Sequence, residues 1–316
     1  MEQSTASKTA LITSLMRAFH ARNDPQPIFI DPWGDKLIPP SVIEHLKQSL
    51  LLRSPDELPS LEDDGSDSIF ESWLRNSSTY SGVITRSRYT EDALHAAIAR
   101  GVKQYVIIGA GFDSYALRMQ DRSDHVEVFE IDHPATQSLK KQFLAEQGVS
   151  LPSSLYFLQA DLAEEKLAAV LSRSSFKSTE PTFFSWLGVT MYLTREANMS
   201  ALHGIAQSGA PGSELVFTYM DQRFFATAAP GSDTNSDYAQ TDKGVASLGE
   251  PFVSGFEPEA LAQNLESVGL KLEEDLDPRE LVDRYDKEGS SGLQGTSRSR
   301  IARACILGDF TADRRE

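Results

Sequence analysis

The sequence predicts an α/β fold in which helices cover both faces of a mostly parallel sheet. Two observations lead to this prediction. From residue 104 onwards, short apolar runs alternate with segments of helical periodicity, as expected of consecutive strand and helix units. The first run breaks at Gly109-Ala110-Gly111, and the second ends in Asp132, about the twenty-residue spacing of a nucleoside-binding strand, turn, helix and strand.

The residues before the first strand are expected to be helical. Residues 6–20 place apolar side chains at helical spacing, a second helix is expected within 28–52, and a third from Thr90 to Arg100 that ends at Gly101. Residues 54–68 are rich in Ser, Asp, Glu and Pro and predict a loop. We therefore expect an N-terminal helical cap over residues 1–85 and a cofactor-binding domain over 86–316.

The expected strands are 104–108, 126–131, 155–159, 182–187, 214–219, 270–276 and 301–307. The expected helices between them are 114–119, 135–147, 162–172, 195–208 and 258–267. A long Gly, Ser, Asp and Ala-rich segment at 226–250 interrupts the alternation. It is expected to be either a lid or disordered.

The composition limits the classes of partner. The chain of 316 residues has 30 basic and 46 acidic residues and a net charge of -16, so neither nucleic acid nor an anionic membrane is the expected partner. The single cysteine, Cys305, lies in an apolar run and predicts a buried thiol. The N-terminus lacks a long apolar stretch. We expect a cytoplasmic protein without a metal site.

The glycine turn favours one nucleoside over another. A dinucleotide would place its pyrophosphate at the start of the following helix, but the third glycine of that fingerprint is absent, because Ser114 occupies its position, and Asp113 puts a carboxylate there. S-adenosylmethionine carries a ribose for Asp132 and a cationic amino-acid tail that tolerates an acid. The turn residues Gly109, Ala110, Gly111 and Asp113 therefore predict a site for S-adenosylmethionine.

Residues that follow the other strands are candidates for the same site, because ligands of open α/β sheets bind beyond the carboxyl ends of the strands. Asp161 could accept the adenine amine and the Leu162 amide could donate to a ring nitrogen, although Asp161 could equally be a helix N-cap. Arg86 or Arg88 could hold the methionine carboxylate, or could be solvated surface charges.

The segment after the fourth strand could form a wall beside the transferred methyl group. It runs Trp186-Leu187-Gly188-Val189-Thr190-Met191-Tyr192, and Trp186 and Tyr192 are its candidate substrate-lining residues. Core packing is the alternative for Trp186. No histidine in the chain is an evident general base, so the catalytic residues are not predicted.

Taken together, these motifs resemble the leucine carboxyl methyltransferase family, which includes polyketide O-methyltransferases of the tetracenomycin type. The resemblance is carried by Ile84-Thr85-Arg86-Ser87-Arg88-Tyr89 with Asp92-Ala93-Leu94, Ile108 to Ser114 with Arg118, Phe129 to Pro134, and Asp161-Leu162. It implies a Rossmann-like class I methyltransferase fold, with a seven-stranded sheet whose last strand is antiparallel and a helical cap over the cofactor. It implies cofactor contacts at Arg86 (or Arg88), Gly109, Asp132, Asp161 and Leu162.

One position departs from the family pattern. The eukaryotic leucine carboxyl methyltransferases have a glutamate five residues before the tyrosine that matches Tyr192, and this chain has Leu187 there. An apolar residue at this cofactor-site position fits a small apolar substrate better than a protein tail. We therefore expect an S-adenosylmethionine-dependent O-methyltransferase that acts on a carboxylate or phenol of a polyketide-like secondary metabolite. The alternatives are a nicotinamide-dependent oxidoreductase and a non-methylating cofactor-binding protein, such as an accessory protein or a cyclase.

Overall fold

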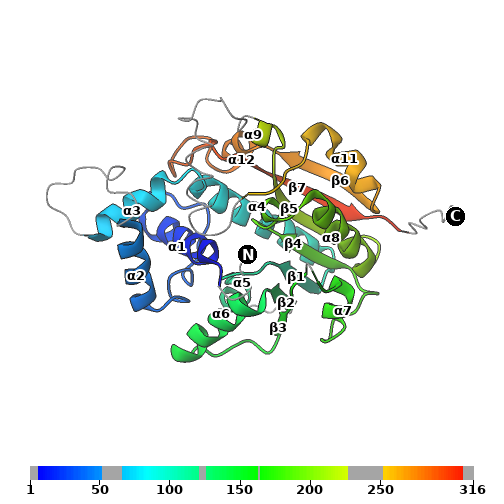
Figure 1. Ribbon diagram of the computed structural model, residues 1–316, viewed down its shortest axis with the longest axis horizontal. Helices are drawn as coiled ribbons and strands as arrows, with labels where there is room; N and C mark the ends of the chain where they lie inside the picture. The colour runs from blue at the N-terminus through cyan, green and yellow to red at the C-terminus, as the bar shows by residue number, and fades with distance from the viewer. Residues whose placement is uncertain (1–5, 52–65, 121–125, 163, 227–251, 309–316) are drawn as a thin grey trace.

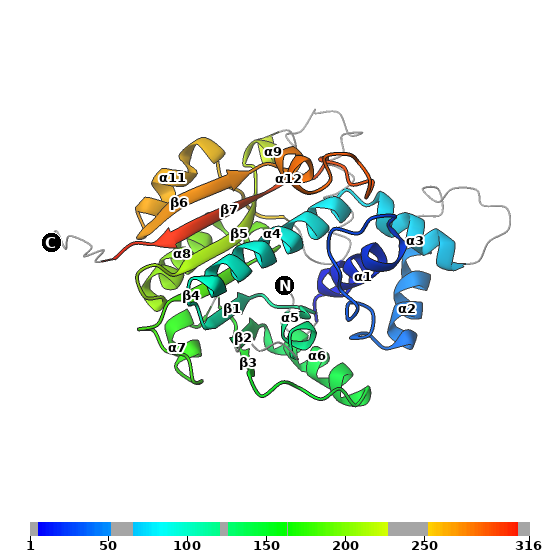
Figure 2. The same cartoon turned by 180° about the vertical axis from the view of Figure 1, so that it is seen from behind.

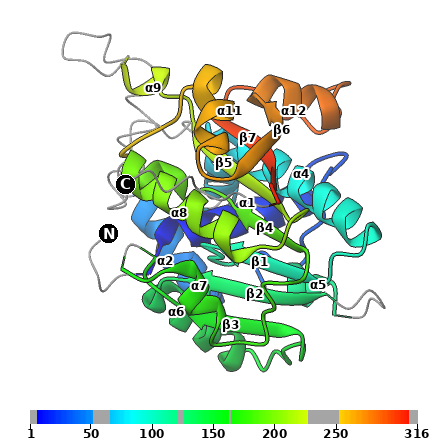
Figure 3. The same ribbon diagram turned by 90° about the vertical axis from the view of Figure 1, so that its right-hand side faces the viewer.

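The computed structural model describes residues 6–51, 66–120, 126–162, 164–226 and 252–308. Its centre is a seven-stranded sheet in the order β3-β2-β1-β4-β5-β7-β6, with helices on both faces (Figures 1 and 3). Strand β7 runs antiparallel to both of its neighbours, and the other pairings are parallel. The strands are β1 Gln104–Ile108, β2 Glu127–Asp132, β3 Leu155–Gln159, β4 Thr182–Trp186, β5 Glu214–Met220, β6 Leu270–Leu276 and β7 Ser299–Ile306. The predicted sheet is confirmed, including its antiparallel last strand.

Helices enclose the sheet and extend beyond one end of it. They are α1 Lys8–Asn23, α2 Pro40–Leu51, α3 Ser66–Asn76, α4 Tyr80–Ala99, α5 Tyr115–Arg118, α6 Pro134–Glu146, α7 Leu167–Leu171, α8 Arg195–Ser208, α9 Arg223–Ala226, α11 Pro258–Glu266 and α12 Pro278–Tyr285, with a 3-10 turn η1 at Thr190–Tyr192. Helices α8 and α11 cover one face of the sheet, and the long α4 crosses the other (Figures 1 and 2).

The alternation of side chains along the strands divides the core between these two faces. Ile108 and Phe184 point towards the apolar side chains of α7, α8 and α11, whereas Tyr105 and Phe183 point towards those of α4, α5 and α12. The strands are apolar on both sides because both faces of a parallel sheet are buried. This explains why the central strands appear in the sequence as nearly continuous apolar runs.

Helix α4 begins ten residues earlier than the sequence indicated, at Tyr80 and not at Thr90. The prediction that Arg86 and Arg88 precede this helix was therefore wrong, since both lie inside it. Tyr80 and Ile84 are buried in the cluster formed by α1, α2 and α3. This packing outweighs the weak helix preference of the β-branched residues around position 84. Helix α4 thus crosses the predicted domain boundary at residue 85.

The cap consists of α1, α2, α3 and the first half of α4, grouped at one end of the sheet (Figure 2). Helix α1 packs closely against the segment that follows it, because a Cβ atom on Gly34 would lie 2.4 Å from the Ser14 carbonyl oxygen. The Ser14 hydroxyl donates to the Gly34 carbonyl oxygen at 2.7 Å. Helix α3 was not predicted, and most of the predicted 54–68 loop and of the 226–250 segment lies outside the described residues.

Two local predictions needed correction, and two short helices were missed. Helix α7 begins at Leu167 and not at residue 162. The short helices α9 and α12 were not predicted. Cys305 is half-buried and not in the core, because its neighbours Ala304 and Ile306 take the inward positions of β7 while its thiol faces Glu273, with Sγ 3.3 Å from Oε1.

Candidate cofactor site

The glycine turn and Asp132 meet at the carboxyl ends of β1 and β2. The Gly109 and Ala110 amides both donate to the Ile131 carbonyl oxygen, at 2.9 and 3.1 Å. The Gly111 amide donates to Oδ2 of Asp132, and the His133 amide donates to its Oδ1 at 2.6 Å. The turn is therefore fastened to the end of β2 through the main chain and through this one carboxylate.

The Asp132 carboxylate retains capacity for a ligand. Each of its oxygens accepts one main-chain hydrogen bond, and a carboxylate oxygen can accept two. Burial raises the pKa of Asp132, and the Gly111 and His133 amides offset this only in part. A ligand hydroxyl that donates a hydrogen bond to this carboxylate would therefore stabilise its charge.

The two glycines of the turn are needed for backbone conformation and close packing. Gly109 and Gly111 have φ angles of 67° and 51°, in the left-handed region that favours glycine. A Cβ atom placed on Gly109 would lie 2.4 Å from Cγ2 of Val189, and one placed on Gly111 would lie 3.0 Å from Cβ of Ala10. The chain segments that approach these glycines are thus the loop after β4 and the helix α1.

Helix α1 supplies contacts to the turn that the sequence did not reveal. Arg17 donates from Nη2 to the Phe112 carbonyl oxygen at 2.7 Å and pairs with Asp31 at 2.9 Å. At the start of the helix, the Ser7 amide donates to the Thr136 hydroxyl of α6 at 3.1 Å. The cap therefore contacts both segments that border Asp132.

Asp113 places its carboxylate at the start of α5, as the sequence predicted. Its Oδ1 accepts from the Tyr115 amide at 2.8 Å. The end of the turn therefore carries an acid. An acid at this point disfavours a phosphate and accommodates a cationic ligand group.

The structure separates the two candidate arginines. Arg86 lies against Gly188 in the loop after β4, because a Cβ atom placed on Gly188 would lie 2.9 Å from Nη2 of Arg86. Burial, together with the nearby Arg17 charge, lowers the pKa of Arg86 to about 10. No ion pair is formed between Arg86 and any residue that the structure describes. It is a partly buried cation without a counter-charge among the described residues, which favours binding of an anion.

Arg88 has a different environment. It pairs with Asp92 at 3.0 Å, donates to the Ile28 carbonyl oxygen at 2.9 Å, and its guanidinium lies 5.5 Å from the centre of the Tyr285 ring. Its charge is already neutralised by Asp92. Of the two arginines, Arg86 is the one that faces the loops at the carboxyl ends of the strands.

Asp161 and Leu162 follow β3, beside Asp132. The Ala160 amide donates to the Asp132 carbonyl oxygen at 2.9 Å, which places the two aspartates on adjacent strand ends. Asp161 is not the N-cap of α7, because Lys166 occupies that position. Leu162 is half-buried and packs against the core.

The residues after β4 lie in three environments. Trp186 is 1% exposed and belongs to the core on the α8 side of the sheet. It therefore packs in the core, as in the alternative to a substrate-lining role. Leu187 is partly buried on the α4 side. Tyr192 packs in a small apolar cluster with Met191, Met220, Phe224, Phe225 and Phe252. Tyr192 is close enough to Arg86 to raise the pKa of that arginine slightly, so the cluster lies on the same side of the molecule as this guanidinium.

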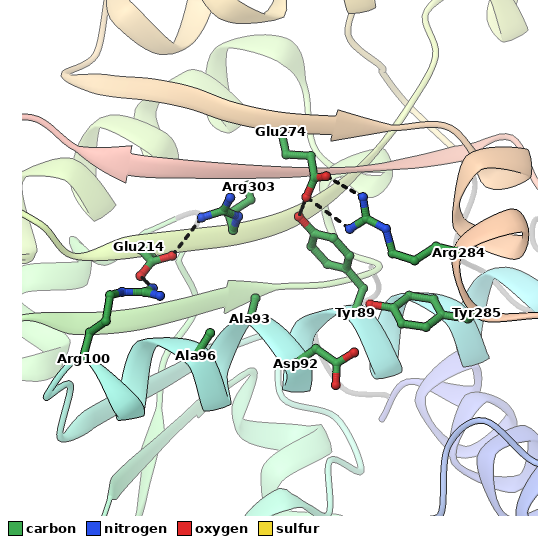
Figure 4. A pocket seen from close by; sticks show the side chains of 10 residues that line it. All are labelled: Tyr89, Asp92, Ala93, Ala96, Arg100, Glu214, Glu274, Arg284, Tyr285 and Arg303. Carbon is green, nitrogen blue, oxygen red and sulfur yellow. Dashed lines mark hydrogen bonds and ion pairs between the residues drawn. The ribbon is translucent and has the colours of Figure 1, made fainter.

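A separate cavity of about 240 Å³ lies between α4 and the β5-β7-β6 side of the sheet (Figure 4). Its charges are paired within the protein. Arg100 and Arg303 both pair with Glu214, the latter at 3.2 Å. Glu274 accepts from the Tyr89 hydroxyl at 2.5 Å and from Arg284 at 2.6 Å. This cavity is lined by none of the residues of the glycine turn, and we do not assign the cofactor to it.

His133, the histidine next to Asp132, has a structural role. The His133 ring accepts from the Ala135 amide at 3.3 Å and caps α6. Among the described residues there is no group of three or more His, Cys, Asp or Glu arranged to hold a metal ion. None of the helices described is long and apolar enough to span a membrane.

The strand order, the antiparallel β7 and the glycine turn at the end of β1 define a class I methyltransferase fold. Solved structures agree with this assignment. A DUF574 family protein from Streptomyces avermitilis superposes with a TM-score of 0.58 at 14% identity, covering 95% of this chain and 98% of that one. A protein from Thermobifida fusca, described provisionally as a methyltransferase, gives a TM-score of 0.52 at 15% identity over 78% of this chain and 90% of that one.

The chain belongs to the leucine carboxyl methyltransferase family, whose model matches residues 10–206. YktD of Bacillus subtilis is 33% identical over 90% of this chain and 93% of its own length, and it is named provisionally as an S-adenosyl-L-methionine-dependent methyltransferase. A Mycolicibacterium smegmatis protein with the same description is 31% identical over 71% of this chain and 70% of its own. The protein is thus an S-adenosylmethionine-dependent methyltransferase, and the nicotinamide alternative is set aside.

Proposed function

We propose that this methyltransferase is an O-methyltransferase whose acceptor is a carboxylate or phenol of a small, apolar, polyketide-like metabolite. The observation that carries the proposal is the apolar cluster around Tyr192, which is formed by the segments after β4 and β5 and contains a tyrosine that influences the pKa of Arg86. Leu187, where the eukaryotic leucine carboxyl methyltransferases have a glutamate, lies on the α4 side and brings no charge to the segment after β4. A small apolar acceptor fits these side chains better than a charged peptide.

The cofactor would be held by the residues at the strand ends. Asp132 would accept the ribose hydroxyls, and Arg86, which has no ion pair within the described part of the chain, would hold the methionine carboxylate. Asp161 and the Leu162 amide would bind the adenine, while Gly109, Ala110, Gly111 and Asp113 would form the turn beneath the ligand. Bound S-adenosylmethionine supplies a methyl group on a positively charged sulfur.

The protein's own part in the reaction would be to position the acceptor and exclude water. Transfer from a sulfonium to an oxygen anion removes two opposite charges, so a water-poor site favours it. The buried Met191, Met220 and Phe224 provide such surroundings. A carboxylate acceptor is ionised at neutral pH and needs no general base, whereas a phenol with a pKa of about 10 would benefit from one.

Calorimetric titration with S-adenosylmethionine, repeated on Asp132→Ala, tests the cofactor site. The substitution removes the carboxylate that the ribose would use, so we expect binding to weaken by about 1–3 kcal/mol. Unchanged affinity would show that the ligand is held elsewhere.

The acceptor is tested by release of S-adenosylhomocysteine with matched sets of small aromatic carboxylates, phenols and amines. We expect turnover with carboxylates or phenols and none with the matching amines. Turnover with amines alone would contradict the oxygen acceptor. Cofactor binding without turnover on any set would favour the non-methylating alternative.

A further inference from the structure

A fully buried ion pair lies directly under the glycine turn. Lys140 of α6 donates from Nζ to Oε2 of Glu130 on β2 at 2.5 Å. Both residues are 1% exposed. Replacing a buried ion pair with apolar residues of similar size is often neutral or stabilising, so its presence here is not explained by stability alone.

The same ammonium group has a second acceptor, which belongs to the turn. Nζ of Lys140 donates to the backbone carbonyl oxygen of Asp113 at 2.6 Å. The preceding carbonyl, that of Phe112, accepts from Arg17 of the cap. Two consecutive carbonyl groups of the turn are thus held by two cations, one from each side.

The carboxylate partner connects this contact to the cofactor site. Glu130 precedes Asp132 by two residues on β2 and therefore lies on the same side of the strand. Asp132 accepts from the Gly111 amide, and Glu130 accepts from the lysine that donates to the Asp113 carbonyl. The turn is consequently fixed by two residues of the same strand, directly by Asp132 and through Lys140 by Glu130.

We infer that Lys140, anchored by Glu130, is a positioning residue for cofactor binding, which holds the turn in the geometry that S-adenosylmethionine requires. The inference rests on the proposed assignment of this turn and Asp132 to the cofactor. Lys140 would not touch the ligand. Its hydrogen bond to the Asp113 carbonyl would reduce the conformational freedom that binding otherwise has to remove.

Two substitutions break the same ion pair but differ at the turn. Lys140→Met removes the donor to the Asp113 carbonyl. Glu130→Gln keeps Lys140 and leaves that donor in place. A purely structural ion pair would respond similarly to both changes, whereas a positioning role requires the first to be much the more damaging to cofactor binding.

Lys141→Met is the matched control. Lys141 is the next residue of α6, and its Nζ lies 5.8 Å from the centre of the Phe157 ring, the same distance as that of Lys140. It is exposed. Its substitution removes a lysine from the same helix, together with its contact with the same aromatic ring, but leaves the hydrogen bond of Lys140 to Asp113 in place.

The measurements are calorimetric affinity for S-adenosylhomocysteine and amide hydrogen exchange of the folded protein. For Lys140→Met we expect affinity to fall about tenfold, equal to the loss of roughly one net hydrogen bond. Amides of residues 109–118 should exchange faster, with those of β5 unchanged. Glu130→Gln should change affinity less than about threefold, and Lys141→Met should match the wild type.

Equal losses in Lys140→Met and Glu130→Gln, or wild-type affinity in a folded Lys140→Met, would overturn the inference. If Lys140→Met does not fold, the double variant Lys140→Met/Glu130→Leu removes both charges and is measured in its place, with the same tenfold expectation. Asp132→Ala separates the two hypotheses. If affinity falls in Asp132→Ala but is unchanged in Lys140→Met, only the positioning role is refuted. If affinity is unchanged in both variants, the site itself is refuted.

Discussion

Replacing Arg86 with methionine should have opposite effects on the ligand-free protein and on cofactor binding. The guanidinium lies against Gly188 and has no ion pair among the described residues. In the free protein it is therefore a partly buried cation with no counter-charge among those residues. In the complex the methionine carboxylate would supply that counter-charge.

Both magnitudes follow from the structure. Burial, with a smaller contribution from Arg17, lowers the pKa of Arg86 from 12.5 to about 10. At about 1.4 kcal/mol per pH unit, this sets an upper limit of about 3 kcal/mol on the cost of keeping the charge. Arg86→Met should recover about 1–3 kcal/mol of unfolding free energy without ligand. Loss of a charged hydrogen bond to the ligand should weaken cofactor binding by about 1.5–3 kcal/mol, or roughly ten- to a hundredfold.

Urea unfolding of the ligand-free protein and calorimetric titration with S-adenosylhomocysteine measure the two quantities. Arg88→Met is the control, because Arg88 and its partner Asp92 are both more than 40% exposed. Such a pair contributes at most about 1 kcal/mol, and its removal should leave cofactor affinity within about twofold. Wild-type affinity in Arg86→Met, or a large loss confined to Arg88→Met, would refute the assignment of the carboxylate to Arg86.

Two further predictions concern stability. Burial raises the pKa of Glu130 to about 7, and Lys140 offsets this only in part, so Glu130 is fully ionised and ion-paired with Lys140 only above neutral pH and is a neutral hydrogen-bond partner below it. Because the folded protein then holds a proton that the unfolded chain releases near pH 4.5, this residue's contribution to stability should fall as pH rises from about 4.5 to 7. Urea unfolding at pH 5, 6 and 7 should show this decline relative to Glu130→Gln, and parallel curves would contradict it. Gly34→Ala should destabilise by about 2–4 kcal/mol, because its Cβ would lie 2.4 Å from the Ser14 carbonyl oxygen. Gly204→Ala, where the nearest atom is 3.8 Å away, should be neutral or slightly stabilising, and similar unfolding midpoints for the two alanine variants would show that α1 yields at no cost.

The strands and the glycine turn could be predicted because their signals are local. Each central strand is buried on both faces, so its apolar run is continuous in the sequence. Gly109 and Gly111 mark left-handed backbone at the end of β1, and parallel pairing brings Asp132 next to them. A local signal also existed for the missed helix α12, since Asp277 and Glu280 form a capping box at its start.

What the sequence left open depended on contacts between distant segments. It did not distinguish Arg86 from Arg88, because both precede the same apolar pattern. Inside α4 they are two residues apart, a rotation of about 200° around the helix axis, so they point in nearly opposite directions. Arg86 therefore meets Gly188, and Arg88 meets Asp92. The contact of Arg17 with the Phe112 carbonyl joins residues 95 positions apart, and no local pattern encodes such a pair.

Local patterns were therefore enough to predict the α/β class, the strands and the residues at the strand ends, since periodicity and backbone conformation are properties of short segments. Which charges are paired became clear from the folded chain alone. Lys140 under the turn and Arg88 beside Asp92 are neutralised, whereas Arg86 has no ion-pair partner among the described residues. A charge is paired or unpaired according to which segments fold against it, and that information lies in long-range packing and not in the order of neighbouring residues.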